Sequence, residues 1–95
     1  MRTELRPASS SEKIDGGFTS TAGGLDATTP EVAAVVAGEA ETWWPASWLG
    51  TPDTTGTAQT DAVHVLPVGV YTIRVRVDAG VEQPVRDSHI LKVHP

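Results

Sequence analysis

The segment GVYTIRVRVDAG, residues 69–80, alternates strictly between apolar and polar side chains. One parity carries the apolar set Tyr71, Ile73, Val75 and Val77, and the other carries polar residues that include Arg74 and Arg76. A period of two with β-branched and aromatic residues predicts a strand with one buried and one solvated face. Because the buried face must pack against another layer, this segment directs the chain towards a β-rich fold.

Two neighbouring segments extend this pattern towards a meander. DAVHVLP, residues 61–67, is the expected hairpin partner, although its core parity stays open between Val63/Val65 and the set Ala62, His64 and Leu66. VRDSHILKVHP, residues 85–95, alternates again and predicts Leu91 and Val93 in the core, with Ile90, Lys92 and His94 on the other face. Pro84 lies in the connection, where a missing N–H costs little.

The N-terminal half indicates further strands. RTELRP predicts a first strand with Leu5 inward, and EKIDGGFTSTA places Ile14 and Phe18 at one parity. TTPEVAAVVAGEA is ambiguous: Thr29 and Pro30 form an orthodox helix start, whereas three valines in five residues favour a strand, which is slightly ahead. Residues 49–60 are rich in Thr, Gly and Pro and predict a flexible surface loop.

Six to seven short strands without a sustained helix predict an all-β fold. Turn signals recur every 8–12 residues, which is typical of an Ig-like β-sandwich of mostly antiparallel strands. A chain of 95 residues forms one domain. We expect residues 13–95 to form the sandwich and the polar residues 1–12 to form a flexible N-terminal arm.

Composition excludes several classes of function. The formal net charge of −5 disfavours binding to nucleic acid or to an anionic membrane, and no apolar run reaches the length of a spanning helix. The start of the chain has no apolar signal region, so we expect the protein to stay in the cytoplasm where it is made unless it leaves inside a particle. Because a domain this small and without cysteine has a thin stability margin, oligomerisation or docking on an assembly is favoured.

The residues that could carry chemistry form no recognisable catalytic or metal pattern. His89 and His94 are five apart on one predicted strand and therefore point to opposite faces, and His64 lies on another segment. The aspartates fall in predicted turns, and the sequence contains neither a nucleophile elbow nor a phosphate-binding loop. The sequence therefore predicts a protein that is not an enzyme and has no cofactor or metal.

Two arginines project from the solvated face of the best-defined strand. Arg74 and Arg76 are explained most simply by cross-strand partners such as Lys92 or an aspartate. Arginine is also enriched at protein–protein contacts, so the same pair is a candidate interface anchor.

All three tryptophans lie in the stretch AETWWPASWLG. In an extended chain Trp43 and Trp44 must face opposite ways, so they cannot belong to one core or to one sugar platform. We expect Trp43 or Trp48 to be buried and Trp44 to be exposed as a candidate contact residue, with Pro45 fixing the path between them.

These segments together resemble a family of small β-sandwich proteins encoded by tailed phages of actinobacteria, whose genes lie among those for head and head–tail morphogenesis. The resemblance runs from residue 24 onward and rests on LDATTPEVAAVVAG, WWPASW and the final strands. Its structural signature falls on Trp43, Pro45, Trp48, Gly69, Tyr71 and Pro84, with Trp44 at a variable position. Ala27 and Val70 depart from the family pattern, in which Pro and Thr are usual.

The resemblance implies a non-enzymatic virion protein. We expect a capsid decoration, minor capsid or head–tail accessory protein that binds major capsid or head–tail proteins in multiple copies or as a homo-oligomer. The resemblance also favours a strand over a helix for residues 31–37. The alternative, which follows from an exposed Trp44, is a carbohydrate- or cell-surface-binding module.

Overall fold

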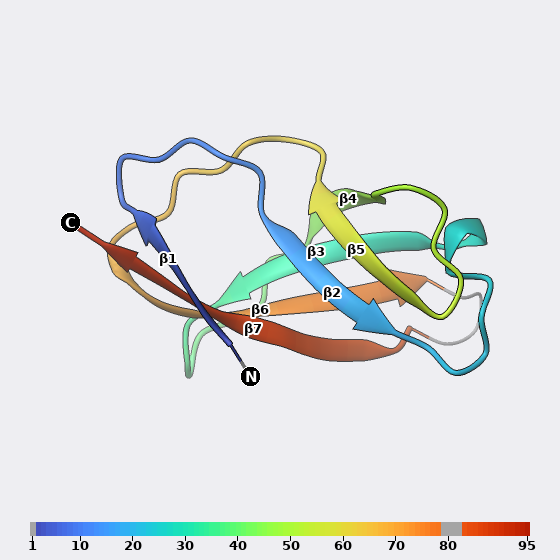
Figure 1. Cartoon of the computed structure of the whole chain (residues 1–95). Helices are drawn as coiled ribbons and strands as arrows, with labels where there is room; N and C mark the ends of the chain where they lie inside the picture. Colours follow the sequence, from blue (N-terminus) through green and yellow to red (C-terminus); the bar gives the residue numbers. More distant parts are fainter. Residues whose placement is uncertain (1, 79–82) are drawn as a thin grey trace.

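The computed structural model in Figure 1 describes residues 2–78 and 83–95 of the chain. Its elements in chain order are β1 (Thr3–Pro7), β2 (Asp15–Thr19), a short 3₁₀ turn η1 (Leu25–Ala27), β3 (Thr29–Val35), β4 (Trp44–Trp48), β5 (Thr55–Thr60), β6 (Gly69–Asp78) and β7 (Val85–His94). The segment 69–80, which is predicted to be a strand, ends in Ala79 and Gly80, and these two residues lie outside the described residues.

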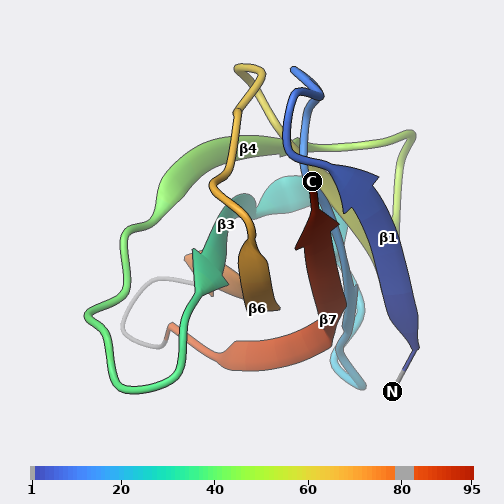
Figure 2. The same ribbon diagram turned by 90° about the vertical axis from the view of Figure 1, so that its left-hand side faces the viewer.

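The seven strands form one continuous sheet in the order β1-β7-β6-β3-β4-β5-β2. β1 and β7 are parallel and every other pair is antiparallel. Figure 2 shows the sheet curling round its own core, so that the molecule is a half-barrel. The predicted all-β fold of six to seven mostly antiparallel strands is therefore confirmed with seven strands, whereas the two-sheet Ig-like sandwich is not.

The long strands β6 and β7 supply the centre of the core. Ile73 and Val75 have no exposed surface, and Leu91 and Val93 are 2% exposed. The predicted parity of both strands is confirmed. Complete burial of such side chains contributes roughly 1.5–3 kcal/mol each, which makes this strand pair the main source of stability.

β3 settles the ambiguity between helix and strand in favour of the strand. It pairs with β6 over all seven of its residues, from Thr29 opposite Asp78 to Val35 opposite Thr72. Val32 is fully buried, which the stiff β-branched side chains of a pleated sheet allow.

β2 crosses over the centre of the sheet and thereby closes the curl. Ile14 and Phe18 are both 3% exposed, which confirms their shared parity. Between them, a Cβ atom at Gly16 would collide with Cγ2 of Val75 on β6. Glycine is therefore required where the two strands approach, because no side chain fits between them.

The prediction for residues 49–67 is wrong in two respects. Residues 55–60 of the expected loop form β5, which pairs with β2 and with β4. The expected hairpin partner, residues 61–67, is a connection in which Val63 and Val65 are more than half exposed and Leu66 is buried. Small side chains mask the strand: Ala58 and Thr60 occupy its core positions, so the sequence shows no strong alternation.

β1 is a strand, as RTELRP predicts, but its predicted parity is wrong. Leu5 is 67% exposed, whereas Arg6 is 4% exposed and points inward. The guanidinium Nη2 of Arg6 donates to the backbone oxygens of Ser10, Glu12 and His64, which stabilises the buried charge. The expected arm over residues 1–12 thus contains a paired strand, and its flexibility in solution stays a prediction.

Candidate interaction surface

The outer, convex face of the sheet carries two of the three residues predicted at an interface. Arg74 and Arg76 project from it, because the core side chains of β6 occupy the opposite parity. Arg74 contacts the carboxylates of Asp87 at 2.7 Å and Glu41 at 3.0 Å. The hydrogen bond with Asp87, its partner in the β6–β7 register, raises the pKa of Arg74.

Arg76 is satisfied in the same way on the other neighbouring strand. Its Nε and Nη2 atoms donate to Oε1 of Glu31 at 3.1 and 2.8 Å, and the two residues are register partners in the β3–β6 ladder. The guanidinium also lies 4.5 Å from the centroid of the Trp43 ring, a cation–π contact. Both arginines are thus cross-strand partners of acidic residues, the simpler of the two explanations for them.

These contacts hold the connection between β3 and β4 against the sheet. Glu41 and Trp43 belong to that connection and contact Arg74 and Arg76 respectively. Ala33 lies on the outer face yet has no exposed surface. We define the charged half of the outer face by these residues: Glu31, Glu41, Trp43, Arg74, Arg76 and Asp87.

The predicted orientation of Trp44 is wrong. Trp44 packs against the hydrophobic core, although it is not fully buried, and its ring stacks on His64 with centroids 4.1 Å apart. Burial, together with the charge of Arg6, lowers the pKa of His64, which favours the neutral ring. His64 covers one ring face of Trp44, and the ring's position against the core disfavours a sugar platform.

Trp48 accompanies Trp44 rather than Trp43. Trp44, Ala46 and Trp48 share one parity of β4, because alternate residues of a strand face the same way. Trp48 donates from Nε1 to the backbone oxygen of Thr28 at 3.1 Å and meets Phe18 edge-on. The core pair is therefore Trp44 and Trp48, while Trp43 contacts the outer face.

The other members of the structural signature lie at strand ends and in the core. Pro45 is exposed on β4, opposite Glu31 of β3. Gly69 begins β6, and Tyr71 is buried with its hydroxyl donating to the backbone oxygen of Pro67 at 2.7 Å. Pro84 precedes β7 and accepts a hydrogen bond from the N–H of Val77.

The opposite half of the outer face is apolar and exposed. Leu5 of β1 and Val70 of β6 flank Lys92 of β7 in one cross-strand row. Leu5 is 67% exposed and Val70 is 56% exposed. The apolar side chains on the core face of β6 and β7 are buried, in contrast to these two. The next row contains Ile90, which is half-buried, and Val68 precedes β6 with 57% of its surface exposed.

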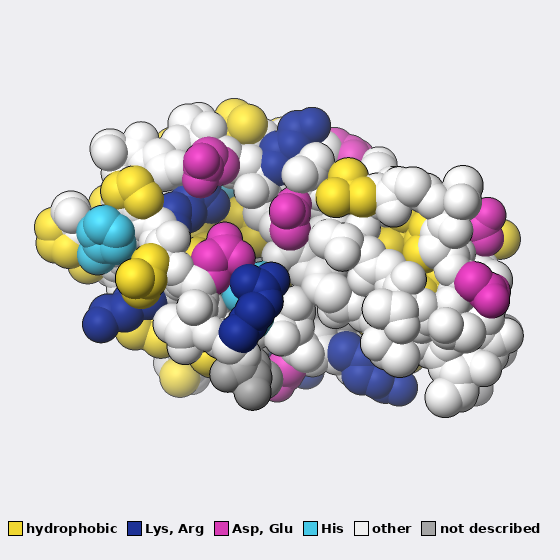
Figure 3. Space-filling model, viewed as in Figure 1, with side chains coloured by type: hydrophobic (Ala, Val, Ile, Leu, Met, Phe, Trp, Pro, Cys, Tyr) yellow, Lys and Arg dark blue, Asp and Glu magenta, His cyan; other side chains and the backbone are white. Residues whose placement is uncertain are grey.

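We define the apolar half by Leu5, Val68, Val70, Ile90 and Lys92. Figure 3 shows hydrophobic side chains gathered at the end of the molecule that carries the C-terminus. Over the described residues, Lys92 has no ion-pair partner. This half therefore offers apolar surface around one uncompensated positive charge.

The sequence signal for the apolar half was present but was distributed. The alternation of residues 85–95 predicts Ile90 and Lys92 on the outer face, which is confirmed. The sequence predicts Leu5 on the inner face, which is wrong, so it does not predict the row of Leu5, Lys92 and Val70. Only the parallel pairing of β1 with β7 brings these residues together.

The three histidines do not come together. His89 is 1% exposed and His94 is exposed, which confirms that they point to opposite faces of β7. Within residues 2–78 and 83–95, no group of three or more His, Cys, Asp or Glu side chains is placed to hold a metal ion.

No family model matches the chain, and no curated protein matches its sequence significantly. The described part of the chain also contains no helix with the length and hydrophobicity needed to cross a membrane. The assignment of a function therefore rests on the surface geometry and on the resemblance given above.

Proposed function

We propose that this protein is a structural component of a phage virion, a capsid decoration, minor capsid or head–tail accessory protein present in multiple copies. The observation that carries the proposal is the apolar half of the outer face. Leu5 of β1 and Val70 of β6 lie on either side of β7 in one exposed row, and an exposed apolar patch of this kind indicates a surface that a partner covers.

The partner's surface has a defined chemistry. It presents apolar side chains to Leu5 and Val70 and a carboxylate to Lys92, whose charge has no ion-pair partner within the described chain. A major capsid or head–tail protein with such a patch is the proposed partner. The role is one of binding: it needs no catalysis, cofactor, nucleic acid or membrane, and it places the protein in the virion after synthesis in the host cytoplasm.

The small core supports the same proposal. The chain has 95 residues and no disulfide, so docking that covers exposed apolar surface adds stability that the isolated domain lacks. The net charge of −5 keeps free copies apart before docking, because like-charged proteins repel one another.

Quantitative mass spectrometry of purified virions tests the proposal. We expect the protein at a fixed copy number per particle, and we expect the double variant Leu5→Ser/Val70→Ser to be depleted from particles while it stays folded. Absence of the wild-type protein from purified virions would contradict the proposed function.

A further inference from the structure

The sheet ends in two strands, β1 and β2, which differ in what lies beside them. β2 is closed onto the opposite side of the half-barrel, because Gly17 N–H donates to Ser88 Oγ at 2.8 Å and Gly16 lies against Val75. β1 pairs with β7 alone, and within the described part of the chain no strand lies on its other side. Figure 2 shows β1 at the border of the half-barrel. The free edge of β1 is therefore the place where the sheet can be extended.

The backbone of β1 directs hydrogen-bonding groups alternately to β7 and to this free edge. Arg2 O accepts a hydrogen bond from β7 at 3.0 Å and Ala8 N–H donates one to β7 at 2.8 Å, so the even-numbered residues face β7. The N–H and C=O groups of Thr3 and Leu5 consequently point to the free edge. No hydrogen bond within the described residues occupies these four groups.

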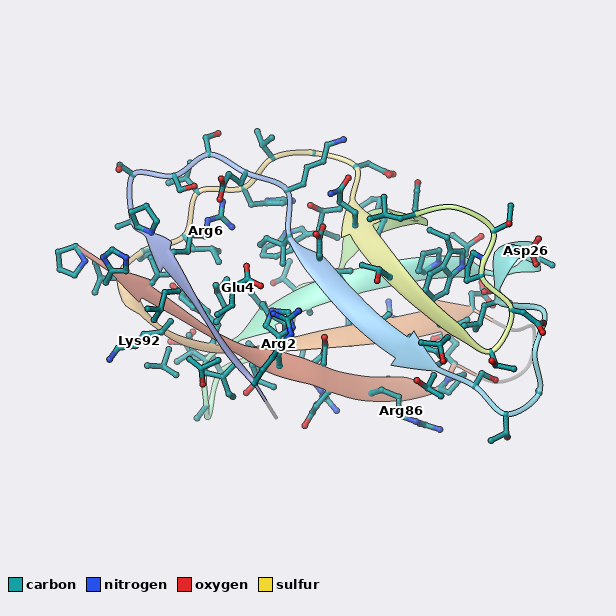
Figure 4. The ribbon with its side chains drawn as sticks, viewed as in Figure 1. Arg2, Glu4, Arg6, Asp26, Arg86 and Lys92 are labelled. Carbon is teal, nitrogen blue, oxygen red and sulfur yellow. The ribbon has the colours of Figure 1, made fainter. Side chains whose placement is uncertain are left out.

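The free edge is accessible from both faces of the sheet. Leu5 is 67% exposed on the outer face, and the side chain of Glu4 is 47% exposed on the inner face. In Figure 4, Arg2 and Glu4 extend from β1 to the side of β2, while Lys92 projects from β7 in the opposite direction. The edge ends at Pro7, which has no N–H and whose C=O accepts a hydrogen bond in the turn that follows. It therefore has room for a short strand.

The side chains of β1 protect the inner face of the edge but not its outer face. Charged side chains commonly protect an edge against strand addition, and the charges of Arg2 and Glu4 lie on the inner face, where they pair with each other at 3.1 Å. The outer face carries Leu5, which begins the row that continues through Lys92 and Val70. A strand beside β1 extends this row by one position and places a side chain next to Leu5. The free edge is thus continuous with the apolar half.

A second copy of the chain fits this edge poorly. In the two-fold register that pairs Thr3 of each copy with Leu5 of the other, Glu4 of one copy lies directly opposite Glu4 of the other. Like charges in such cross-strand positions are destabilising. The net charge of −5 on each copy adds to the repulsion. These charges favour a segment of a different protein as the occupant of the edge.

We propose that an extended segment of the major capsid or head–tail partner pairs with the free edge of β1 and adds an eighth strand to the sheet. Its backbone bonds to the N–H and C=O groups of Thr3 and Leu5, and it places an apolar side chain next to Leu5 on the outer face. The rest of the partner covers Val70 and presents a carboxylate to Lys92. The proposal rests on the proposed function and specifies how the partner meets the apolar half.

A proline substitution isolates the strand pairing. Thr3→Pro removes an N–H that points to the free edge and leaves the β1–β7 hydrogen bonds in place, and Thr3→Ala is the matched control. We expect both variants to keep the wild-type far-ultraviolet circular dichroism spectrum, because Pro7 already occupies an edge-facing position of the same strand.

Binding of these variants to purified particles that lack the protein measures the contribution of the edge. Thr3→Pro should bind about tenfold or more weakly than wild type, because a carbonyl of the incoming strand loses its donor, and Thr3→Ala should bind within about twofold of it. Equal binding of all three proteins would overturn the proposal, since a partner that only covers the outer face does not need this N–H.

Amide hydrogen exchange on the wild-type protein gives a test that does not depend on a variant's folding. Docking on particles should slow the exchange of the amides of Thr3 and Leu5. The amides of Glu4 and Arg6, which face β7, are the internal control and should exchange more slowly than these two already in the free protein.

The outcomes separate this proposal from the proposed function. If the protein docks but the amides of Thr3 and Leu5 exchange as fast as in solution, the eighth strand is refuted while the proposed function stands. Protection of these amides when the protein alone is concentrated would assign the edge to a second copy and also refute the proposal. If the wild-type protein does not dock, the proposed function itself fails.

Discussion

The two halves of the outer face share strands β6 and β7, but the charged half is completed by β3 and the apolar half by β1, and their side chains are satisfied in opposite ways. In the charged half, Arg74 and Arg76 are each paired with acidic residues of their own chain. In the apolar half, Leu5 and Val70 are more than half exposed, and Lys92 has no ion pair within the described residues.

The difference shows that the charged half is complete in the free protein. Exposed ion pairs contribute little to stability, but here they satisfy both arginines, so no positive charge is left for a neighbour to neutralise. The apolar half, in contrast, gains free energy only when another surface excludes water from it. The residues available for binding are thus the apolar ones rather than the arginines.

The largest expected effect is on the free energy of unfolding, and it should differ between two adjacent residues of β6 that face opposite sides of the sheet. Tyr71→Ala should lower the free energy of unfolding by about 3–5 kcal/mol, because Tyr71 is buried and its hydroxyl donates to Pro67 O. Val70→Ala should lower it by less than about 0.5 kcal/mol, because Val70 is exposed. Urea denaturation of both variants measures the difference, and equal losses would show that the two faces are assigned wrongly.

A charge reversal tests whether the charged half serves folding rather than docking. Arg76→Glu places a carboxylate opposite Glu31, so we expect it to lower the free energy of unfolding by about 1 kcal/mol. Arg76→Gln is the control without the repulsion and should lose less. If Arg76→Glu unfolds at the wild-type urea midpoint but no longer docks, Arg76 is a docking residue and the expectation is wrong.

The pH dependence of stability should come from a buried histidine and not from the charged half. Burial, followed by the charge of Arg2, lowers the pKa of His89, although Glu4 and Asp15 oppose this shift. Because the unfolded chain then binds the proton more readily, stability is complete above the unfolded pKa of about 6.5 and is lost as the pH falls through it.

Denaturation between pH 7.5 and 5.5 tests this prediction. The wild-type urea midpoint should fall with pH, and His89→Gln should reduce the slope, whereas His94→Gln, at an exposed position of the same strand, should leave it unchanged. Part of the slope should remain in His89→Gln, because the pKa of His64 is lowered as well. A slope equal to that of the wild-type protein would assign the dependence to groups other than His89.

The smallest expected effect concerns the connection between β3 and β4. Glu41→Gln removes one partner of Arg74 and should lower the free energy of unfolding by no more than about 0.5 kcal/mol, since Asp87 remains. The same change should speed amide exchange in residues 36–43. Unchanged exchange there would show that the ion pair does not hold the connection.

The strands with strong apolar alternation could be predicted from the sequence, and the others could not. β6 and β7 bury Ile73, Val75, Leu91 and Val93 as expected, because large side chains fill every core position. β5 fills its core positions with Ala58 and Thr60, so the pattern that identifies a strand is absent. A local pattern also cannot show that the sheet curls into one half-barrel, which depends on the close approach of Gly16 to Val75.

The candidate surface was predicted in part. Strand alternation predicts Arg74 and Arg76 on the outer face, which is confirmed, but their acidic partners Asp87 and Glu31 come from other strands and depend on register. The orientation of Trp44 depends on where β4 begins, and β4 begins at Trp44 itself. Strand alternation separates Trp43 from Trp44 but does not tell which of the two faces inward.

One competition experiment on particles lacking the protein tests the central claim most directly. It compares the wild-type protein with two double variants, Leu5→Ser/Val70→Ser and Arg74→Gln/Arg76→Gln, after thermal unfolding has shown that all are folded. We expect the apolar double variant to lose at least tenfold in affinity, about 1.4 kcal/mol or more, and the arginine double variant to stay within twofold of wild type. The reverse order of losses would contradict the account and make the arginines the docking residues.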